Sequence, residues 1–292
     1  MKRLAIANTK GGPGKSTVAV ELAYTYMRWF GLRVVILDGD FQGTATNFCT
    51  EAGATPYEQL AEDCCITALL DESKWPDTDK IVHKLVTMPG LAIIRANYAW
   101  KRATDVPVGE RAKKLPLIDE LLEELNDDYD LAVIDVPAHS SFSASMAIAA
   151  ADFVLTPTRP TKSDIFALPQ TRQLINEVNA AYARPRGAVK WLALLVCQIQ
   201  KIRNAHRIWR DFLKDQYPEL ALIPPGADMP IELPLIGKLD EAPMRHLPES
   251  SRASSLATQV FKQLAVEVAR RMALPLPEAP GELEKKPQKR RA

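Results

Sequence analysis

The residues with the clearest chemical capacity lie near the N-terminus, in the run Lys10-Gly11-Gly12-Pro13-Gly14-Lys15-Ser16-Thr17. A short apolar run precedes them and a helical pattern of apolar residues follows them. In such a sequence the glycines let backbone N–H groups approach phosphates, the late lysine reaches the β- and γ-phosphates, and the next hydroxyl binds Mg²⁺. Gly14, Lys15 and Ser16 fit these roles. All eight residues are therefore predicted to form a phosphate-binding loop for a nucleotide with magnesium.

The loop departs from the strict G-x-x-x-x-G-K-S/T pattern in informative ways. Thr9 stands where the pattern has its first glycine, and Lys10 is one lysine more than nucleotide binding requires. Pro13 has no N–H, which removes one possible phosphate donor and bears on affinity more than on fold. A glycine-rich surface turn is the alternative, but the order of strand, loop and helix favours the phosphate-binding interpretation.

Apolar, β-branched runs recur along the chain between helical patterns. The runs are Leu4 to Ala7, Val34 to Leu37, Leu91 to Ile94, Leu131 to Val136, Phe153 to Thr156 and Trp191 to Val196. Helices are predicted at Lys15 to Phe30, Leu115 to Asn126, Ser163 to Tyr182, Asn204 to Gln216 and Ser254 to Met272. Residues 71–80 and 97–114 are left as loops or short helices. This alternation predicts an α/β fold, a mostly parallel twisted sheet with helices on both faces.

Bulk composition limits the classes of protein. The 292 residues carry a net charge of +1, so any anion-binding surface must be local. The four cysteines lack metal-ligand spacing and suit a reduced cytoplasmic compartment. No run is long enough for a membrane span or a signal peptide. We expect one domain over residues 1–273 and a disordered basic tail over residues 274–292, because that Pro-, Glu- and Lys-rich end has little apolar surface to bury.

Carboxylates follow two of the predicted strands. Asp38 and Asp40 come directly after the second strand, at the edge where open α/β sheets bind ligands. Asp135 ends the fourth run and has the position of a carboxylate that holds Mg²⁺ beside a nucleotide. We expect Ser16 and Asp135 to form the metal site.

These motifs together resemble the ParA/MinD group of P-loop ATPases with a deviant Walker A loop. The resemblance rests on Lys10 to Thr17, Leu37 to Thr46 and Leu131 to Pro137. The D-x-D-x-Q-G-x-A-T block and the run from Val154 to Pro160 are most similar to ParA partition ATPases. The chain starts directly at the first strand, so it resembles the small ParA type without an N-terminal helix-turn-helix. Phe41 and Ala138-His139 depart from the usual pattern without removing a phosphate or metal ligand.

The resemblance implies a set of roles. The nucleotide is sandwiched between two subunits, Lys10 reaches the partner's phosphates, and Lys15 binds phosphate in its own subunit. Asp40 positions the attacking water, and Asp38 lies near the Mg²⁺ shell, so it joins Ser16 and Asp135 in the expected metal site. The implied activity is ATP hydrolysis with slow intrinsic turnover, because a site completed in trans is incomplete in the monomer. The implied partners are a second copy of the chain, non-specific DNA and a ParB-like stimulator, in a cytoplasmic protein that joins the nucleoid when ATP is bound.

A basic stripe is the candidate DNA contact. Arg203, Arg207, Arg210 and Lys214 are spaced four, three and four residues apart, within a helical stripe roughly 60° wide. Ala205, Trp209 and Phe212 fall on a neighbouring apolar face, so the stripe is expected to face outward. Four cations on one face suit a phosphate backbone. A solvated amphipathic face remains the alternative.

Three other functions are compatible with some or all of these motifs. A MinD-like ATPase that positions proteins or acts on membranes shares the motifs, although the Pro-, Glu- and Lys-rich end lacks an apolar helical face, and we expect no stable membrane association. A redox ATPase similar to nitrogenase iron protein needs bridging cysteines in a context that this chain lacks. An adaptor that binds ATP without turnover also fits the motifs.

Overall fold

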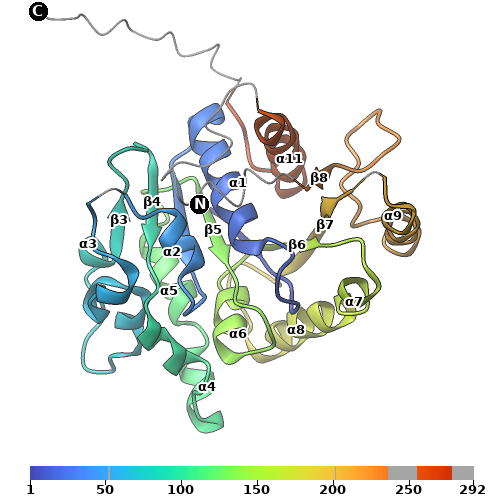
Figure 1. The fold of residues 1–292 in the computed structure, drawn as a ribbon. Helices are drawn as coiled ribbons and strands as arrows, with labels where there is room; N and C mark the ends of the chain where they lie inside the picture. Colours follow the sequence, from blue (N-terminus) through green and yellow to red (C-terminus); the bar gives the residue numbers. More distant parts are fainter. Residues whose placement is uncertain (52, 201, 236–254, 278–292) are drawn as a thin grey trace, which may run out of the picture.

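The structure, a computed structural model, describes residues 1–51, 53–200, 202–235 and 255–277. Within them lies one eight-stranded sheet in the order β3-β4-β2-β5-β1-β6-β7-β8 (Figure 1). Its strands are β1 (Lys2–Ile6), β2 (Val34–Asp38), β3 (Val82–Lys84), β4 (Leu91–Ile94), β5 (Leu131–Asp135), β6 (Phe153–Thr158), β7 (Lys190–Ile199) and β8 (Glu232–Pro234). Neighbouring strands are parallel except β3 and β4. The predicted fold class is confirmed.

The described helices connect and cover these strands. They are α1 (Lys15–Phe30), α2 (Thr44–Phe48), α3 (Thr78–Ile81), α4 (Val108–Lys114), α5 (Leu117–Glu124), α6 (Phe142–Ala149), α7 (Lys162–Ile165), α8 (Leu168–Ala181), α9 (Asn204–Gln216) and α11 (Leu256–Met272). Short 3-10 turns lie at Tyr57–Gln59, Glu62–Cys64, Ile66–Leu70 and Tyr98–Ala103. In the part of the chain that the structure describes, no helix is long and apolar enough to cross a membrane.

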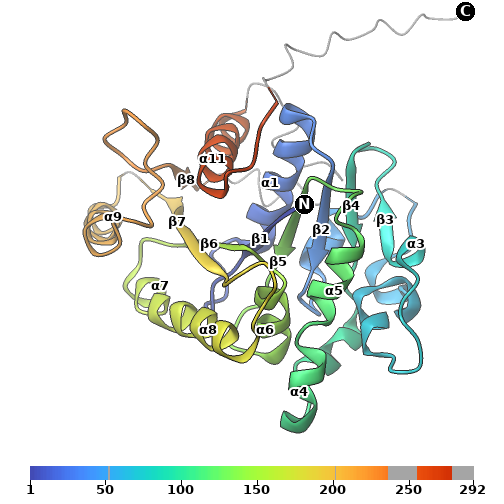
Figure 2. The same ribbon diagram turned by 180° about the vertical axis from the view of Figure 1, so that it is seen from behind.

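Two apolar layers hold the sheet from its two faces (Figures 1 and 2). One layer joins the sheet to α1 and α11, and the other joins it to α5, α6 and α8. Strand β1 shows why the sheet is buried on both faces: Leu4 and Ile6 enter the first layer, while Ala5 and Ala7 enter the second. Because side chains alternate along a strand, the near-continuous apolar runs of the sequence supply both layers.

Two helix predictions need correction, and one helix was missed. The helix expected over residues 163–182 is two helices, α7 and α8, because Pro169 lacks the N–H that would continue α7 and instead occupies the first turn of α8. The helix expected from Leu115 begins at Leu117, after Pro116. Helix α6 was missed because it is apolar all round and buried, so it shows no amphipathic period.

The expected C-terminal tail is described only over its first residues. Leu274 is 7% exposed and belongs to the apolar layer of α1 and α11, and its backbone N–H donates to the Ala269 carbonyl at 2.9 Å. Leu276 packs against the same layer. The basic residues expected to form the tail, Lys285, Lys286, Lys289, Arg290 and Arg291, lie outside the described residues. The disordered tail stays a prediction.

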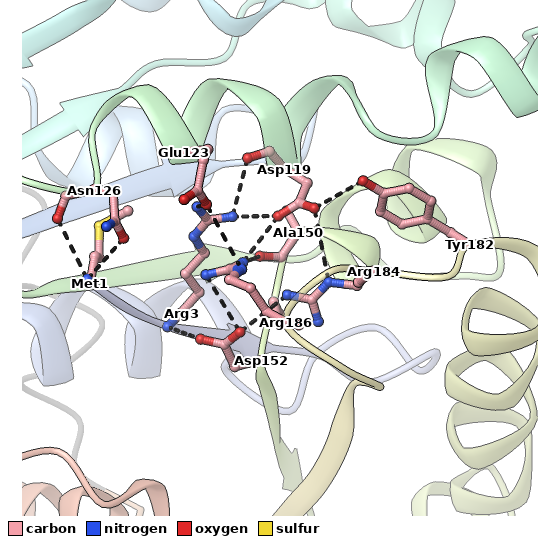
Figure 3. Close-up of polar contacts among 11 residues, drawn as sticks. Met1, Arg3, Asp119, Glu123, Asn126, Ala150, Asp152, Tyr182, Arg184 and Arg186 are labelled. Carbon is pink, nitrogen blue, oxygen red and sulfur yellow. Dashed lines mark hydrogen bonds and ion pairs between the residues drawn. The ribbon is translucent and has the colours of Figure 1, made fainter.

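A network of buried and partly buried charges lies at the end of the sheet opposite the phosphate loop (Figure 3). It joins three arginines to three carboxylates from β1, α5 and the segments around β6 and β7: Arg3, Arg184, Arg186, Asp119, Glu123 and Asp152. Arg3 is fully buried and pairs with Asp119 and Glu123. Since buried charges require partners, these contacts tie α5 to β1 and position the strand whose other end enters the loop.

Candidate nucleotide site

The loop between β1 and α1 has the backbone shape that its glycines predict. Gly12 and Gly14 have φ values of 88° and 90°, in the left-handed region, and Gly14 is the N-cap of α1. Glycine adopts this conformation without the cost that a side chain imposes. The N-terminus of α1 therefore points its free N–H groups into the loop, where an anion is stabilised.

Thr9, in place of the usual first glycine, anchors the loop to its neighbours. Its N–H donates to the Thr171 hydroxyl at 3.3 Å, and its carbonyl accepts from the His139 N–H at 3.0 Å. The first contact ties the loop to α8 and the second to the segment after β5. The threonine side chain adds one contact that glycine cannot make, because its hydroxyl donates to the Ala167 carbonyl at 3.4 Å.

The two lysines of the loop have different surroundings. Lys15 is 8% exposed, and its Nζ donates to the Lys10 carbonyl at 3.5 Å. Burial lowers the pKa of Lys15, while Asp135 and Asp40 oppose that shift. Lys10 is half-buried, and among the described residues its ammonium makes no ion pair. Lys15 is thus a cation directed into the site, and Lys10 remains available for another charge.

Asp38 and Asp135 lie side by side, as register partners on β2 and β5. Both oxygens of Asp38 accept hydrogen bonds, Oδ2 from the Thr46 N–H at 2.8 Å and hydroxyl at 2.7 Å, and Oδ1 from the Asp40 N–H at 3.1 Å. Burial raises the pKa of Asp38 to about 6, although these hydrogen bonds oppose the shift. Asp38 therefore organises the turn that carries Asp40.

Asp135 is the opposite case. It is fully buried, and among the described residues neither carboxylate oxygen has a hydrogen-bond partner of ordinary geometry. Burial and the nearby Asp38 raise the pKa of Asp135, while the Ser16 hydroxyl and Lys15 ammonium oppose that shift. A buried carboxylate without partners is costly, so its retention beside a hydroxyl and a phosphate loop fits a cation ligand.

The turn after β2 is held against β5 at Gly39. Its N–H donates to the Asp135 carbonyl at 2.9 Å, and a Cβ at this position would lie 2.8 Å from that oxygen. The Trp100 indole N–H donates to the Gly39 carbonyl at 2.9 Å. Asp40 is partly exposed, and its Oδ1 accepts from the Gln42 N–H at 3.0 Å. Glycine is thus required for the close approach that brings Asp38, Asp40 and Asp135 together.

The donor set suits Mg²⁺ that is shared with a phosphate. The described residues contain no group of three or more His, Cys, Asp or Glu placed to hold a metal by themselves. Instead they offer the Asp135 carboxylate, whose oxygens are free to bind a cation, and the Ser16 hydroxyl. Magnesium commonly binds through one or two protein oxygens and completes its shell with phosphate oxygens and water. The residues therefore fit the expected metal ion when a nucleotide is present.

Two side chains that sequence reasoning missed lie against the loop. Arg159, after β6, places Nη1 3.5 Å from the position of a Cβ on Gly12. Gln198, on β7, has a φ of 57° and donates from Nε2 to the Gly12 carbonyl at 3.0 Å. Pattern searches could not find them because they are distant in sequence from Gly12, although the arginine in Thr158-Arg159-Pro160 follows a strand at the ligand-binding edge.

The basic stripe of α9 is only partly as expected. Arg203 and Arg207 are exposed. Arg210 is 20% exposed and contacts Asp211 and Glu232 at 2.7 and 3.5 Å, and Lys214 donates to the Asp228 carbonyl at 2.9 Å. The two carboxylates offset the charge of Arg210, and the hydrogen bond to the Asp228 carbonyl holds the Lys214 ammonium against the protein, so both cations are less available to DNA.

The apolar face predicted for α9 is only partly confirmed, because Trp209 is half-buried and packs against the apolar cluster that contains Leu213, while Ala205 and Phe212 are exposed. The helix buries His206 and Leu213, whereas Ala205 is exposed, Ile208 is 63% exposed and Phe212 is 39% exposed. The helix lies at the margin of the molecule beside β7 and β8 (Figure 1), and polar partners there accommodate its polar side.

Comparisons with known proteins agree with this site. A family model described as an AAA domain matches residues 1–190. The sporulation initiation inhibitor protein Soj of Bacillus subtilis is 31% identical over 179 residues, which cover 61% of this chain and 64% of Soj. The chromosome partitioning protein ParA of Caulobacter vibrioides is 29% identical over 195 residues, which cover 65% of each chain. The matched part thus spans slightly less than two thirds of these relatives.

The fold is also similar to that of solved structures. A variant of the Cyanothece McdA protein in complex with ATP superposes with a TM-score of 0.74 at 16% identity, covering 95% of this chain and 98% of that one. At this identity the likeness concerns the fold. It extends through the sheet and both helical layers, well beyond the residues that the AAA-domain model matches.

Proposed function

The chain belongs to the family that the AAA-domain model describes and is a ParA-like P-loop ATPase, and from this premise we propose that ATP switches it into a dimer that binds DNA. A partner protein then stimulates hydrolysis and releases the dimer, which segregates a plasmid, a chromosome or a mobile element. The observation that carries the proposal is the buried, unpartnered Asp135 carboxylate beside Lys15 and Ser16. Such a group fits a site completed by a nucleotide and its cation.

In this proposal the loop binds the phosphates of ATP. The free N–H groups at the start of α1 and the Lys15 ammonium stabilise the phosphate charge. Ser16 and Asp135 hold Mg²⁺, and Asp38 lies near its shell while fixing the turn that presents Asp40. Magnesium, when bound, neutralises charge on the phosphate oxygens. Gly11 and Gly12 are exposed, so the outer side of the loop remains open to a second subunit.

Lys10 links nucleotide binding to dimerisation. Its ammonium has no ion pair among the described residues, whereas Lys15 already points inward. A cation supplied across the interface adds attraction only when phosphates are present, so ATP and the partner subunit stabilise each other's binding. The same arrangement predicts slow hydrolysis by the monomer. Asp40 positions the attacking water, for which its Oδ2, without a hydrogen bond among the described residues, is an acceptor.

Arg203 and Arg207 are the proposed DNA contacts, with smaller contributions from Arg210 and Lys214. The first two are exposed and lie on the first turn of α9 or just before it. Contacts of this type act on the phosphate backbone, so they bind without sequence preference and weaken as salt concentration rises. A dimer doubles the number of such contacts. DNA binding is therefore coupled to ATP through the interface.

Membrane positioning is the alternative output. Helix α11 does not offer a free membrane-binding face, because Phe261, Leu264 and Val268 are buried in the apolar layer with α1. Strong ATP-dependent pelleting with anionic liposomes would nevertheless favour that output over DNA.

The direct test of the proposed switch is the mass of the protein in solution. We expect sedimentation to show a monomer with ADP and a dimer with a non-hydrolysable ATP analogue and Mg²⁺. Lys10→Ala is expected to bind the analogue but to remain monomeric, while Lys15→Ala is expected to lose the analogue itself. A Lys10→Ala protein that dimerises as wild type does would refute the cross-subunit role.

A further inference from the structure

Arg159 is a cation that the expected phosphate site does not include. It follows β6, and its side chain is 31% exposed. Its Nε and Nη2 both donate to Oδ1 of Asp164, each at 3.1 Å. Asp164 is fully buried and also accepts a hydrogen bond from the Thr161 hydroxyl, so its carboxylate is held in one position. Two donors on one buried acceptor fix the plane of the guanidinium.

The flat face of this guanidinium lies over the phosphate loop. Nη1, Cζ and Nη2 lie 3.5, 3.8 and 3.8 Å from the position that a Cβ on Gly12 would occupy. Among the described residues Nη1 has no hydrogen-bond partner, whereas Nε and Nη2 are occupied by Asp164. Gly12 is exposed, and its backbone has a φ in the left-handed region. Its carbonyl accepts a hydrogen bond from the Gln198 side chain on β7. The free donors of Arg159 are therefore held over the open part of the loop.

The order of the strands places this cation on a distinct side of the loop. The loop leaves β1, whose neighbours in the sheet are β5 and β6. Asp38 and Asp135 lie on the side of β5 and β2, and Arg159 lies on the side of β6. Phosphates bound over the loop would therefore have the proposed metal ligands on one flank and an anchored arginine on the other. This arrangement supplies positive charge from both sides.

We propose that Arg159, anchored by Asp164, binds the γ-phosphate of ATP within its own subunit and makes the site prefer ATP over ADP. The proposal rests on the nucleotide-binding function proposed above. The N-terminus of α1 and Lys15 bind the phosphates from the side of the helix, whereas Arg159 lies by Gly12 in the exposed part of the loop. The outermost phosphate is the group of the ligand that differs between ATP and ADP.

A purely structural ion pair makes a different prediction. If Arg159 only balanced the charge of Asp164, its removal would lower stability and weaken all nucleotides together. A phosphate contact instead weakens ATP selectively. One charge-assisted contact to phosphate corresponds to about 10- to 100-fold in affinity. The ratio of ATP to ADP affinity therefore separates the two roles.

The test is calorimetric binding of a non-hydrolysable ATP analogue and of ADP, each with Mg²⁺, to the full chain. We expect Arg159→Gln to weaken the analogue about 10-fold or more and ADP less than about 3-fold. Arg33→Gln is the matched control, because Arg33 is an exposed arginine paired with Asp130 at the opposite end of the sheet. It is expected to leave both affinities unchanged. Arg159→Lys, which keeps the charge but not the double contact to Asp164, is expected to fall between wild type and Arg159→Gln.

Each outcome decides between the roles. Selective weakening of the ATP analogue, graded from Lys to Gln, supports the proposal. Equal weakening of both nucleotides, or unchanged binding by Arg159→Gln beside tight binding by wild type, overturns it while leaving the nucleotide site intact. If Arg159→Gln folds poorly, Arg159→Lys alone decides, since a fall in its ATP preference is still required. Absence of nucleotide binding by wild type would overturn both this inference and the proposed function.

Discussion

Asp135→Asn is expected to stabilise the protein without nucleotide and to remove the stabilisation by Mg²⁺ and ATP. The carboxylate is fully buried with no hydrogen-bond partner of ordinary geometry among the described residues, and burial with Asp38 nearby raises its pKa. Asparagine has nearly the same shape but no charge, so it avoids the cost of desolvating an anion. A residue kept for ligand binding at the expense of stability shows this pattern.

The magnitude follows from the surroundings of the group. A buried polar group without a partner costs about 1–3 kcal/mol, and a charged one costs more. The Lys15 ammonium partly offsets this cost, and the asparagine amide is itself left without partners. We therefore expect a gain of about 1–2 kcal/mol, which for a chain of this size raises the melting temperature by about 2–3 °C.

Asp130→Asn provides the matched control, because Asp130 directly precedes β5 and Asp135 ends it. Asp130 accepts hydrogen bonds from Arg33, including one from Nη2 at 2.8 Å, and these lower its pKa. The pair is largely exposed, so its loss is expected to cost about 0.5–1 kcal/mol. The two variants of one strand should thus change stability in opposite directions.

Thermal unfolding with and without Mg²⁺ and ATP measures both effects. Wild type is expected to gain about 2.7 kcal/mol at a ligand concentration about 100 times its dissociation constant. Asp130→Asn should retain this gain and Asp135→Asn should lose most of it. The reasoning is refuted if Asp135→Asn without nucleotide melts below wild type, since the carboxylate would then be satisfied within the fold.

The remaining predictions concern backbone approach and buried charge. Gly39→Ala is expected to lower the free energy of unfolding by about 1–3 kcal/mol and to weaken ATP binding, because its Cβ would lie 2.8 Å from the Asp135 carbonyl oxygen. The control is Gly109→Ala in α4, where a Cβ meets open space and the substitution should be neutral or stabilising. Equal urea midpoints for the two variants would contradict the steric argument. Burial alone would raise the pKa of Glu267, but two arginines of α11 outweigh it and lower that pKa, so its stabilisation is present above pH 4.5 and lost as pH falls. Glu267→Gln should therefore unfold about 1–2 kcal/mol more easily at pH 7 and match wild type in acid; a constant difference would exclude this origin. Asp119→Ala is expected to cost about 3–5 kcal/mol by urea unfolding, because it leaves the buried arginines short of a partner, and a loss below 1 kcal/mol would show that the network is dispensable.

The sheet was predictable because its strands are buried on both faces. Leu4 to Ala7 and Leu131 to Val136 read as continuous apolar runs for that reason, and the phosphate loop is a local motif that needs no tertiary information. The short edge strands β3 and β8 contain too few residues for a pattern. Helix α6 shows no period because neighbours surround it.

The missed parts of the site depend on contacts between distant residues. Nothing in the sequence near Arg159 shows that Gly12 lies beside it, since the pairing of β6 with β1 creates that contact. Helix α9 was misoriented for a related reason. Glu232 on β8 forms an ion pair with Arg210 on the polar side of the helix. This contact directs Arg210 toward the protein rather than toward solvent. Periodicity alone assigns that arginine to the surface.

The most direct test of the central claim is binding to a random-sequence DNA duplex with a non-hydrolysable ATP analogue or ADP, at low and moderate salt. We expect binding only with the analogue, a steep loss with salt, and a loss in the double variant Arg203→Ala/Arg207→Ala that leaves dimerisation intact. Lys10→Ala should also fail to bind DNA, because it is expected to remain monomeric with the analogue. DNA binding that is equal with ADP and the analogue, or absent from a wild-type dimer that forms normally, would contradict the proposed switch.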